Sequence, residues 1–244
     1  MRLIKTISAI TLFIALVVSC EKNKCFHSVG EQSSKIIYTD SFNFINLYGI
    51  ADMELVQDTT YYIEAFGGSN VIENLEAETI ADSVELYNYN SCFWLRDYER
   101  PLLKVHFKDI NRINLHEASY VYSTDTIRDA FQLTIRCNIA EADLKINNAS
   151  FALIPYGTTG GNYKVAGKTD YLYSYCFYTA ICDASELQCK EARIYQKGTC
   201  DYKLWCTEKL WVQILNRGNV LLKGNPEIII DSLASTGELI NIED

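Results

Sequence analysis

Cysteines are the most distinctive chemistry-bearing residues of this chain. The 244-residue sequence contains nine, and five of them crowd into residues 176–206. Cys20 follows an apolar run at the N-terminus, and the other eight are an even number, which permits disulfides in an exported protein. No two cysteines have the CxxC spacing of a zinc or thioredoxin-like site, so we predict no metal centre from them.

Histidines and carboxylates do not form a recognisable catalytic set. His106 and His116 lie in the middle of the chain, with Asp109 and Glu117 nearby. Adjacent residues of a strand point to opposite faces, so His116 and Glu117 are poorly placed to act together. Neither a GxSxG nor an HExxH motif appears. We therefore predict no catalytic residue and no cofactor.

Glu141 and Asp143 would share one face of a strand. Two carboxylates on one face offer a cation at most a weak site, because Ca²⁺ takes six to eight oxygen ligands. We otherwise predict no metal site.

An aromatic run, "YLYSYCFY" at residues 171–178, is the candidate binding surface. Strand alternation places Tyr171, Tyr173, Tyr175 and Phe177 on one face. Such a face could stack on sugar rings or hold a protein partner. The alternative is structural, because aromatic side chains also pair across strands for about 0.2–1 kcal/mol each.

The first residues, "MRLIKTISAITLFIALVVSC", have the order of an export signal. Arg2 and Lys5 precede an apolar stretch of roughly a dozen residues, which is shorter than the ~20 residues of a spanning helix. "VVSC" then resembles a bacterial lipobox, in which the cysteine is diacylated and becomes the new N-terminus. We predict a signal peptide over residues 1–19, a lipidated Cys20, and a polar tether over residues 20–35. Several acyl chains on one cysteine give stable membrane attachment.

Composition narrows the class of protein. The formal net charge is −9, and removal of Arg2 and Lys5 with the leader makes it −11. An acidic chain without a basic run argues against nucleic acid as a partner. Only 3 prolines and 48% hydrophobic residues argue against disorder, and 17 tyrosines favour strand.

A degenerate repeat of about 20 residues runs through the second half. Rows beginning at residues 131, 151, 171, 191 and 211 each contain an apolar alternating stretch, a turn and a second short strand. Strands that repeat in this way stack into a solenoid with a shared core. A β-sandwich with strands at 8–12-residue spacing is the alternative. On this period, Cys182 and Cys200, and likewise Cys189 and Cys206, lie near one rung apart, which predicts two disulfides or buried thiols.

Strand signals also fill the first half, with one exception. Residues 71–79, "VIENLEAET", are the one plausible short helix, because their apolar residues have helical spacing. We therefore predict an all-β protein: a right-handed parallel β-helix-like solenoid over residues 36–242, with sub-parts at about 36–109 and 110–242.

Residues 44–90 resemble the start of an exported bacterial family, the putative auto-transporter adhesin, head GIN domain. The family pattern is matched at Gly49, Gln57, Gly68, Asn70 and Leu75, and "INRINLHEAS" continues it. The last rung resembles the family's closing motif at Gly218, Asn219, Val220, Gly224 and Pro226.

The resemblance spans about residues 36–242 and implies a β-helix-like fold with no known catalytic residue. Most of the family's glycines and serines in the turns are replaced here by Cys, Tyr, Asn and Thr. Glycine suits such turns because it accepts a positive φ without strain.

From these observations we expect a cell-envelope lipoprotein, exported and anchored in a membrane, most simply the outer membrane or cell surface. Its expected role is non-catalytic binding or adhesion toward a glycan or protein partner. A periplasmic scaffold lipoprotein is the alternative, and a carbohydrate-active enzyme on a β-helix is a third interpretation.

Overall fold

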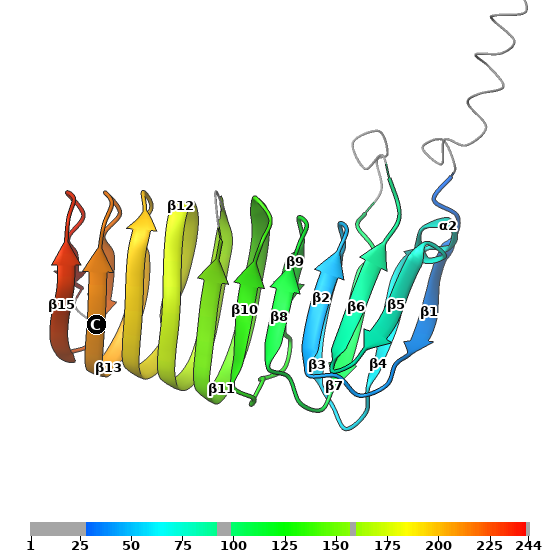
Figure 1. Ribbon diagram of the computed structural model, residues 1–244, viewed down its shortest axis with the longest axis horizontal. Helices are drawn as coiled ribbons and strands as arrows, with labels where there is room; N and C mark the ends of the chain where they lie inside the picture. The colour runs from blue at the N-terminus through cyan, green and yellow to red at the C-terminus, as the bar shows by residue number, and fades with distance from the viewer. Residues whose placement is uncertain (1–27, 92–98, 157–159, 243–244) are drawn as a thin grey trace, which may run out of the picture.

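The computed structural model describes residues 28–91, 99–156 and 160–242, and it is a right-handed β-solenoid of about 6 turns (Figure 1). Strands make up 68% of the chain and helix 2%, so the predicted all-β class is confirmed and the β-sandwich is excluded. The signal peptide of residues 1–19 and the lipidation site Cys20 lie outside the described residues.

Two parallel sheets form the long sides of the coil, and we call them wall A and wall B. Wall A faces the viewer in Figure 1, and its strands run in one direction side by side. In spatial order from the N-terminal end, wall A consists of β6 (Ser83–Asn88), β2 (Phe44–Tyr48), β8 (Arg112–Leu115), β10 (Phe131–Ile135), parts of the long strands β11 (Ile139–Pro155), β12 (Gly160–Gly198) and β13 (Tyr202–Ile214), and β15 (Glu227–Leu233).

Wall B lies behind wall A and is built from the other half of each turn. The strands β11, β12 and β13 bend around the corners and contribute segments to both walls. Its members are β7 (Leu102–Phe107), β3 (Asp52–Gln57), β9 (Tyr120–Tyr122), segments of β11, β12 and β13, then β14 (Val220–Lys223) and β16 (Leu239–Asn241).

The N-terminal turns do not follow chain order. Strand β2 lies between β6 and β8, and β3 lies between β7 and β9, so the first turn in sequence is the second in space. Antiparallel strands then close this end: β1 (Gln32–Tyr38) pairs with β4 (Tyr62–Gly68), β4 pairs with β7, and β5 (Leu75–Ile80) pairs with β6.

The short helix is real but smaller than predicted. Helix α2 covers Ser69–Ile72, whereas we expected it over residues 71–79. The remainder is β5, whose side chains alternate between covered and exposed from Leu75 onward. Antiparallel pairing with β6 supplies the backbone hydrogen bonds, and this tertiary pairing outweighs the weak local helix preference.

The tether is also shorter than predicted. Residues 32–35 belong to β1, although their sequence "QSSK" is polar and we placed them in a flexible segment ending at residue 35. They form an edge strand whose side chains face solvent, so their backbone bonds to β4 rather than their hydrophobicity defines the strand.

One hydrophobic core runs the length of the coil between the walls. Ile45, Ile113, Leu133 and Leu153 are successive register partners across four neighbouring strands, and each is at most 2% exposed. Each fully buried side chain of this size stabilises the fold by about 1.5–3 kcal/mol. No single rung could bury its apolar side alone, so the stacking is what makes the rungs stable.

The predicted repeat is confirmed, and its offset varies from turn to turn. Phe131 pairs with Phe151, an offset of 20, whereas Ser150 pairs with Tyr171, an offset of 21. Because of the extra residue, a side chain at a given position of the 20-residue row points outward in one row and toward the core in the row before it. Phe131 and Phe151 therefore face the core, and Tyr171 faces outward.

Candidate functional site: an aromatic and basic ladder on wall A

The predicted aromatic run lies on the outer face of wall A. Tyr171, Tyr173, Tyr175 and Phe177 are each half-buried, while the intervening Leu172, Ser174 and Cys176 are buried in the core. The strand alternation of these seven residues is as predicted. Tyr178 departs from it, because it has a φ of 46° and is 51% exposed at the turn.

The next rung adds a tyrosine that completes the surface. Tyr195 stacks on Tyr175 with ring centroids 4.4 Å apart and an interplanar angle of 13°. Tyr173 meets Tyr195 edge-on at 5.7 Å, and its hydroxyl lies 3.0 Å from that of Tyr175. Phe177 stacks on Tyr175 at 5.5 Å. The four rings form one continuous aromatic patch.

Two cations rest on this patch. The Lys197 ammonium lies 5.5 Å from the ring centroid of Tyr175, 5.6 Å from that of Phe177 and 6.0 Å from that of Tyr195. The Arg193 guanidinium lies 5.7 Å from the Tyr195 ring, and its Nη2 is 3.4 Å from the Asp231 carboxylate. Cation–π contacts hold such side chains flat against the rings without neutralising their charge.

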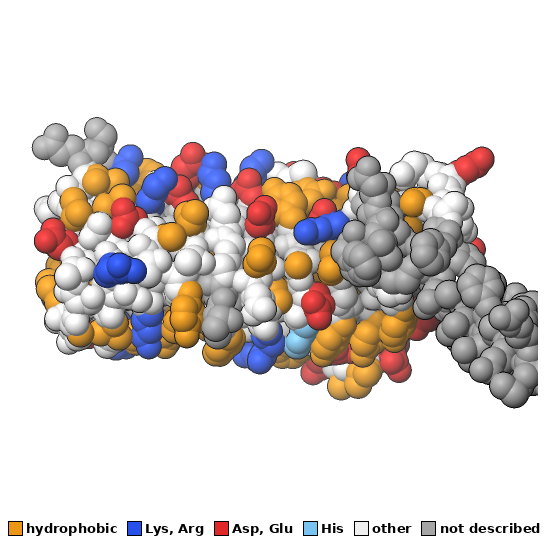
Figure 2. All heavy atoms as spheres, turned by 90° about the horizontal axis from the view of Figure 1, so that it is seen from above, with side chains coloured by type: hydrophobic (Ala, Val, Ile, Leu, Met, Phe, Trp, Pro, Cys, Tyr) orange, Lys and Arg blue, Asp and Glu red, His pale blue; other side chains and the backbone are white. Residues whose placement is uncertain are grey.

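The same column of wall A continues toward the N-terminal end with more rings and a further cation. Tyr87 stacks on Tyr48 at 5.2 Å, and Tyr48 stacks on His116 at 4.2 Å. The next two rungs place Arg136 over Tyr156 at 5.5 Å between its guanidinium carbon and the ring centroid. Figure 2 views the coil from above, and its lower edge carries hydrophobic and basic side chains side by side along much of its length.

Backbone register explains why these side chains line up. Hydrogen bonds from the amides of His116, Arg136 and Tyr156 reach the rung before each of them, so the three residues hold equivalent positions in successive turns. Thr199 donates to the Tyr178 carbonyl and sets Phe177 opposite Lys197 in the same way. Rungs lie about 4.8 Å apart, which is close to a stacking distance for planar groups.

We call this line the ladder surface. Its members are Tyr87, Tyr48, His116, Arg136, Tyr156, Tyr173, Tyr175, Phe177, Tyr195 and Lys197. Burial, aided by the nearby Arg136, lowers the pKa of His116, so its imidazole is neutral at pH 7. Burial and the neighbouring Glu85 raise the pKa of Tyr48, which stays a phenol. The surface therefore offers flat rings, hydroxyls and fixed positive charges, which are groups that can bind a ligand.

The two histidines have partners, but neither joins a catalytic set among the described residues. His106 lies with Nδ1 3.3 Å from Asp58, a pair that the sequence analysis did not foresee. Its ring is covered by Tyr62 at 4.0 Å between centroids, and the residue is only 8% exposed. A general base needs access to a substrate proton, which the covered imidazole lacks.

Glu141 and Asp143 share the outer face of β11, as predicted. In the described ranges no group of three or more His, Cys, Asp or Glu residues gathers in a geometry that could hold a metal ion. The pair of carboxylates therefore stays below the ligand number that Ca²⁺ requires.

The six described cysteines are free thiols in the structure. Cys189 and Cys206 are register partners in neighbouring strand segments, so their predicted bridge joins residues that already lie side by side. Cys182 instead pairs in register with Tyr202, and its thiol contacts that of Cys176. The geometry thus favours Cys176 over Cys200 as the neighbour of Cys182, while both predicted bridges stay predictions.

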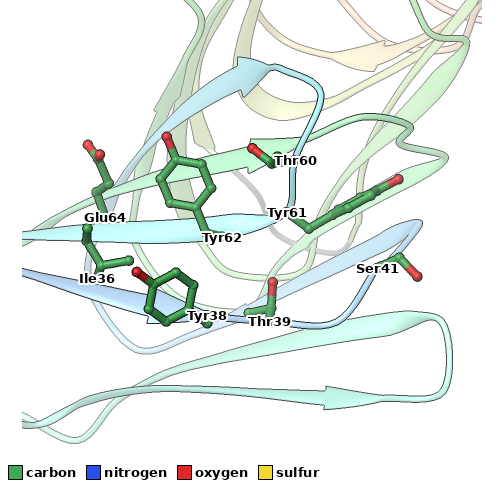
Figure 3. A pocket seen from close by; sticks show the side chains of 8 residues that line it. All are labelled: Ile36, Tyr38, Thr39, Ser41, Thr60, Tyr61, Tyr62 and Glu64. Carbon is green, nitrogen blue, oxygen red and sulfur yellow. The ribbon is translucent and has the colours of Figure 1, made fainter.

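A cleft of about 570 Å³ opens at the N-terminal end between β1 and β4. Figure 3 shows the rings of Tyr38 and Tyr62 next to one another, with Glu64 and Ile36 toward one end. Tyr38 is 82% exposed, so the cleft is open along this side. The surface of its lining is mainly apolar, although all but one of the lining residues carry a hydroxyl or a carboxylate: Ile36, Tyr38, Thr39, Ser41, Thr60, Tyr61, Tyr62 and Glu64.

Three of the ten members of the ladder surface, Tyr173, Tyr175 and Phe177, were predicted from the sequence, and the other seven were missed; Tyr171 was predicted but lies outside the ladder surface. Tyr195 and Lys197 lie 20 residues after Tyr175 and Phe177, so the rows of the repeat already aligned them. The N-terminal members carried no such signal, because β2 and β6 are not in chain order along the coil.

Comparison with solved structures shows the same fold in several bacterial proteins. A "putative adhesin" from Bacteroides fragilis superposes with a TM-score of 0.78 at 16% identity, over 87% of this chain and 97% of that one. A "putative lipid binding protein" from Parabacteroides distasonis gives 0.59 at 15% identity, covering 87% and 98%. A "putative adhesin" from Parabacteroides merdae gives 0.54 at 15% identity, covering 87% and 97%.

Within the described ranges, no helix is long and apolar enough to cross a membrane. No curated protein matches the chain. Residues 41–226, most of the coil, match a family model. The chain belongs to the family described as putative auto-transporter adhesin, head GIN domain.

Proposed function

We propose that this chain is an exported, lipid-anchored adhesin that binds an extended partner, without catalysis, through the ladder surface. The observation that carries the proposal is the stacked pair of Tyr175 and Tyr195, 4.4 Å apart, with Lys197 lying over both rings. Tyrosine side chains, and arginines such as Arg136, are enriched where proteins bind their partners.

An extended partner fits the shape of the surface. One column of the surface has a ring or a cation on every rung from Tyr87 to Lys197, so the surface extends parallel to the axis of the coil rather than around a pocket. Stacked repeats create long surfaces of this type, which suit chain-like ligands such as glycans or unfolded segments of proteins.

Export and lipid anchoring rest on the leader and Cys20, supported by the adhesin description of the family. A periplasmic scaffold that binds another envelope protein is the alternative, and it would use the same surface from the other side of the membrane. Protease treatment of intact cells separates the two: a surface adhesin is cleaved, whereas a periplasmic protein is protected.

Binding of the full mature chain to an array of glycans and extracellular matrix proteins tests the role of the ladder. We expect at least one extended ligand to be retained, and the double variant Tyr175→Ala, Tyr195→Ala to bind it at least tenfold more weakly. Loss of two stacked rings removes about 0.5–1.5 kcal/mol per aromatic pair in addition to the contact area.

The matched control is Tyr120→Ala. Tyr120 stacks on Tyr122 at 5.2 Å on wall B, so its variant removes a stacked tyrosine from the opposite side of the coil. If the control weakens binding as much as the ladder variant does, the ladder is not the binding surface.

A further inference from the structure

Three cations of wall A have no ion pair with a described carboxylate: Arg112, Arg136 and Lys197. The ion pairs found among the described residues involve other basic groups. Each of the three rests on an aromatic ring instead, with Arg112 over Phe44 at 5.9 Å. The chain has a net charge of −9, yet no ion pair with a described carboxylate balances these three positive charges.

Arg136 and Lys197 occupy the same column of the ladder surface. Three rungs separate them, which is about 14 Å at 4.8 Å per rung. Tyr156 and Phe177 occupy the two positions between, so the order along the axis is cation, ring, ring, cation. Arg136 and Tyr156 are exposed, and Phe177 and Lys197 are half-buried, so a ligand can reach all four.

Glu85, an acid beside Tyr48 in this column, is already engaged. Glu85 is 9% exposed and accepts hydrogen bonds from Asn46 and from Ser83. Three rungs separate it from the rung of Arg136, so it does not neutralise that cation.

We propose that the ligand of the ladder surface is an acidic polysaccharide that lies along the axis of the coil. This inference rests on the proposed function and names its ligand class. Sugar rings stack on Tyr156 and Phe177, and carboxylate or sulfate groups of the chain accept hydrogen bonds from Arg136 and Lys197. Charged groups carried by a chain of sugar rings match two cations that are held some distance apart with aromatic rings between them.

Binding of the full mature chain to polygalacturonate tests the proposal, and its methyl ester serves as the uncharged ligand of the same backbone. Chondroitin sulfate reports whether sulfate replaces carboxylate. We expect the wild-type chain to bind polygalacturonate or chondroitin sulfate at least tenfold more tightly than the methyl ester, with affinity that falls as salt rises.

Removal of positive charge from the ladder surface should weaken that binding, and each charge that is removed should lower the affinity further. We expect Arg136→Gln and Lys197→Gln each to lower affinity for the charged polymer about fivefold and the double variant about 25-fold, while binding of the methyl ester is unchanged. Lys168→Gln is the control, because Lys168 is an exposed lysine of β12 that pairs in register with Asn147, outside the ladder surface. All three side chains are on the surface, so the variants keep the core intact.

The results separate this inference from the proposed function. If the charged and uncharged polymers bind equally, or if Arg136→Gln and Lys197→Gln behave like Lys168→Gln, the acidic ligand is wrong. The proposed function survives that result if the Tyr175→Ala, Tyr195→Ala variant still loses binding to a polymer. If no polymer binds, and the array shows only globular proteins, both are wrong.

Discussion

Replacement of Glu54 by glutamine should destabilise the fold in a pH-dependent way. Its side chain is 8% exposed on wall B, and its carboxylate lies 3.0 Å from the Lys104 ammonium. Thr124 donates a hydrogen bond to it at 3.0 Å, and the Tyr122 hydroxyl donates another at 3.3 Å. Burial alone would raise the pKa of Glu54, but the hydrogen bonds from Lys104 and Thr124 outweigh it and lower the pKa.

The size of the effect follows from these contacts. A hydrogen bond to a charged group is worth about 1.5–3 kcal/mol net, but glutamine keeps the shape and can still accept from Thr124. The Lys104 side chain is 34% exposed and can turn to water. We therefore expect Glu54→Gln to lower the free energy of unfolding by about 1–2 kcal/mol at pH 7.

The sign of the pH dependence is fixed by the direction of the pKa shift. A carboxyl whose pKa is lower in the folded chain stabilises the fold above its unfolded pKa, near 4.3, and this contribution disappears as pH falls through the folded pKa. Urea unfolding at pH 7 and at about pH 3 measures it, with Glu76→Gln, an exposed glutamate on β5, as the control. A difference between wild type and Glu54→Gln that is equal at both pH values would refute the electrostatic reasoning.

Three further expectations follow from the coil. Gly167→Ala should lower the free energy of unfolding, measured in urea, by about 2–3 kcal/mol. Gly167 has a φ of +113°, and an added Cβ would meet a carbonyl of the neighbouring rung. The control variant Gly160→Ala should lower the free energy of unfolding by less. Chain purified from an oxidising compartment should yield a linked Cys189–Cys206 peptide in non-reducing mass spectrometry; alkylation of both thiols without reductant would contradict this. Cys20→Ser should abolish incorporation of labelled fatty acid and release the chain from membranes; unchanged labelling would exclude this cysteine as the anchor.

The repeat period and the outward aromatic run could be predicted because the geometry of a solenoid constrains which residue types its sequence can place at each position. Each rung must supply inward apolar residues at equivalent places, so Phe131 and Phe151 recur 20 residues apart. The offset of 21 between Ser150 and Tyr171 could not be predicted, because one residue more or less in a turn leaves the composition of the row unchanged. That residue decides which aromatic side chains reach the surface.

The order of the N-terminal strands could not be predicted for a different reason. A sequence pattern shows where apolar and polar residues alternate along a strand. The sequences of β2 and β6 have the same alternation, with apolar residues at their second and fourth positions. Their neighbours are decided by a crossover that brings β8 next to β2 rather than next to β6. The stack of Tyr87, Tyr48 and His116 is a product of that crossover, so it is visible only in three dimensions.

Register is therefore the property that links this fold to its proposed role. An outward position that recurs once per rung becomes a line on the surface, and a line of rings and cations can engage a long ligand at many points at once. Several weak contacts along one chain add to a firm attachment, because ordering the ligand for the first contact lowers the entropic cost of the next. A rigid stack of strands serves this purpose better than loops would, since it holds successive rings at fixed spacing before the ligand arrives.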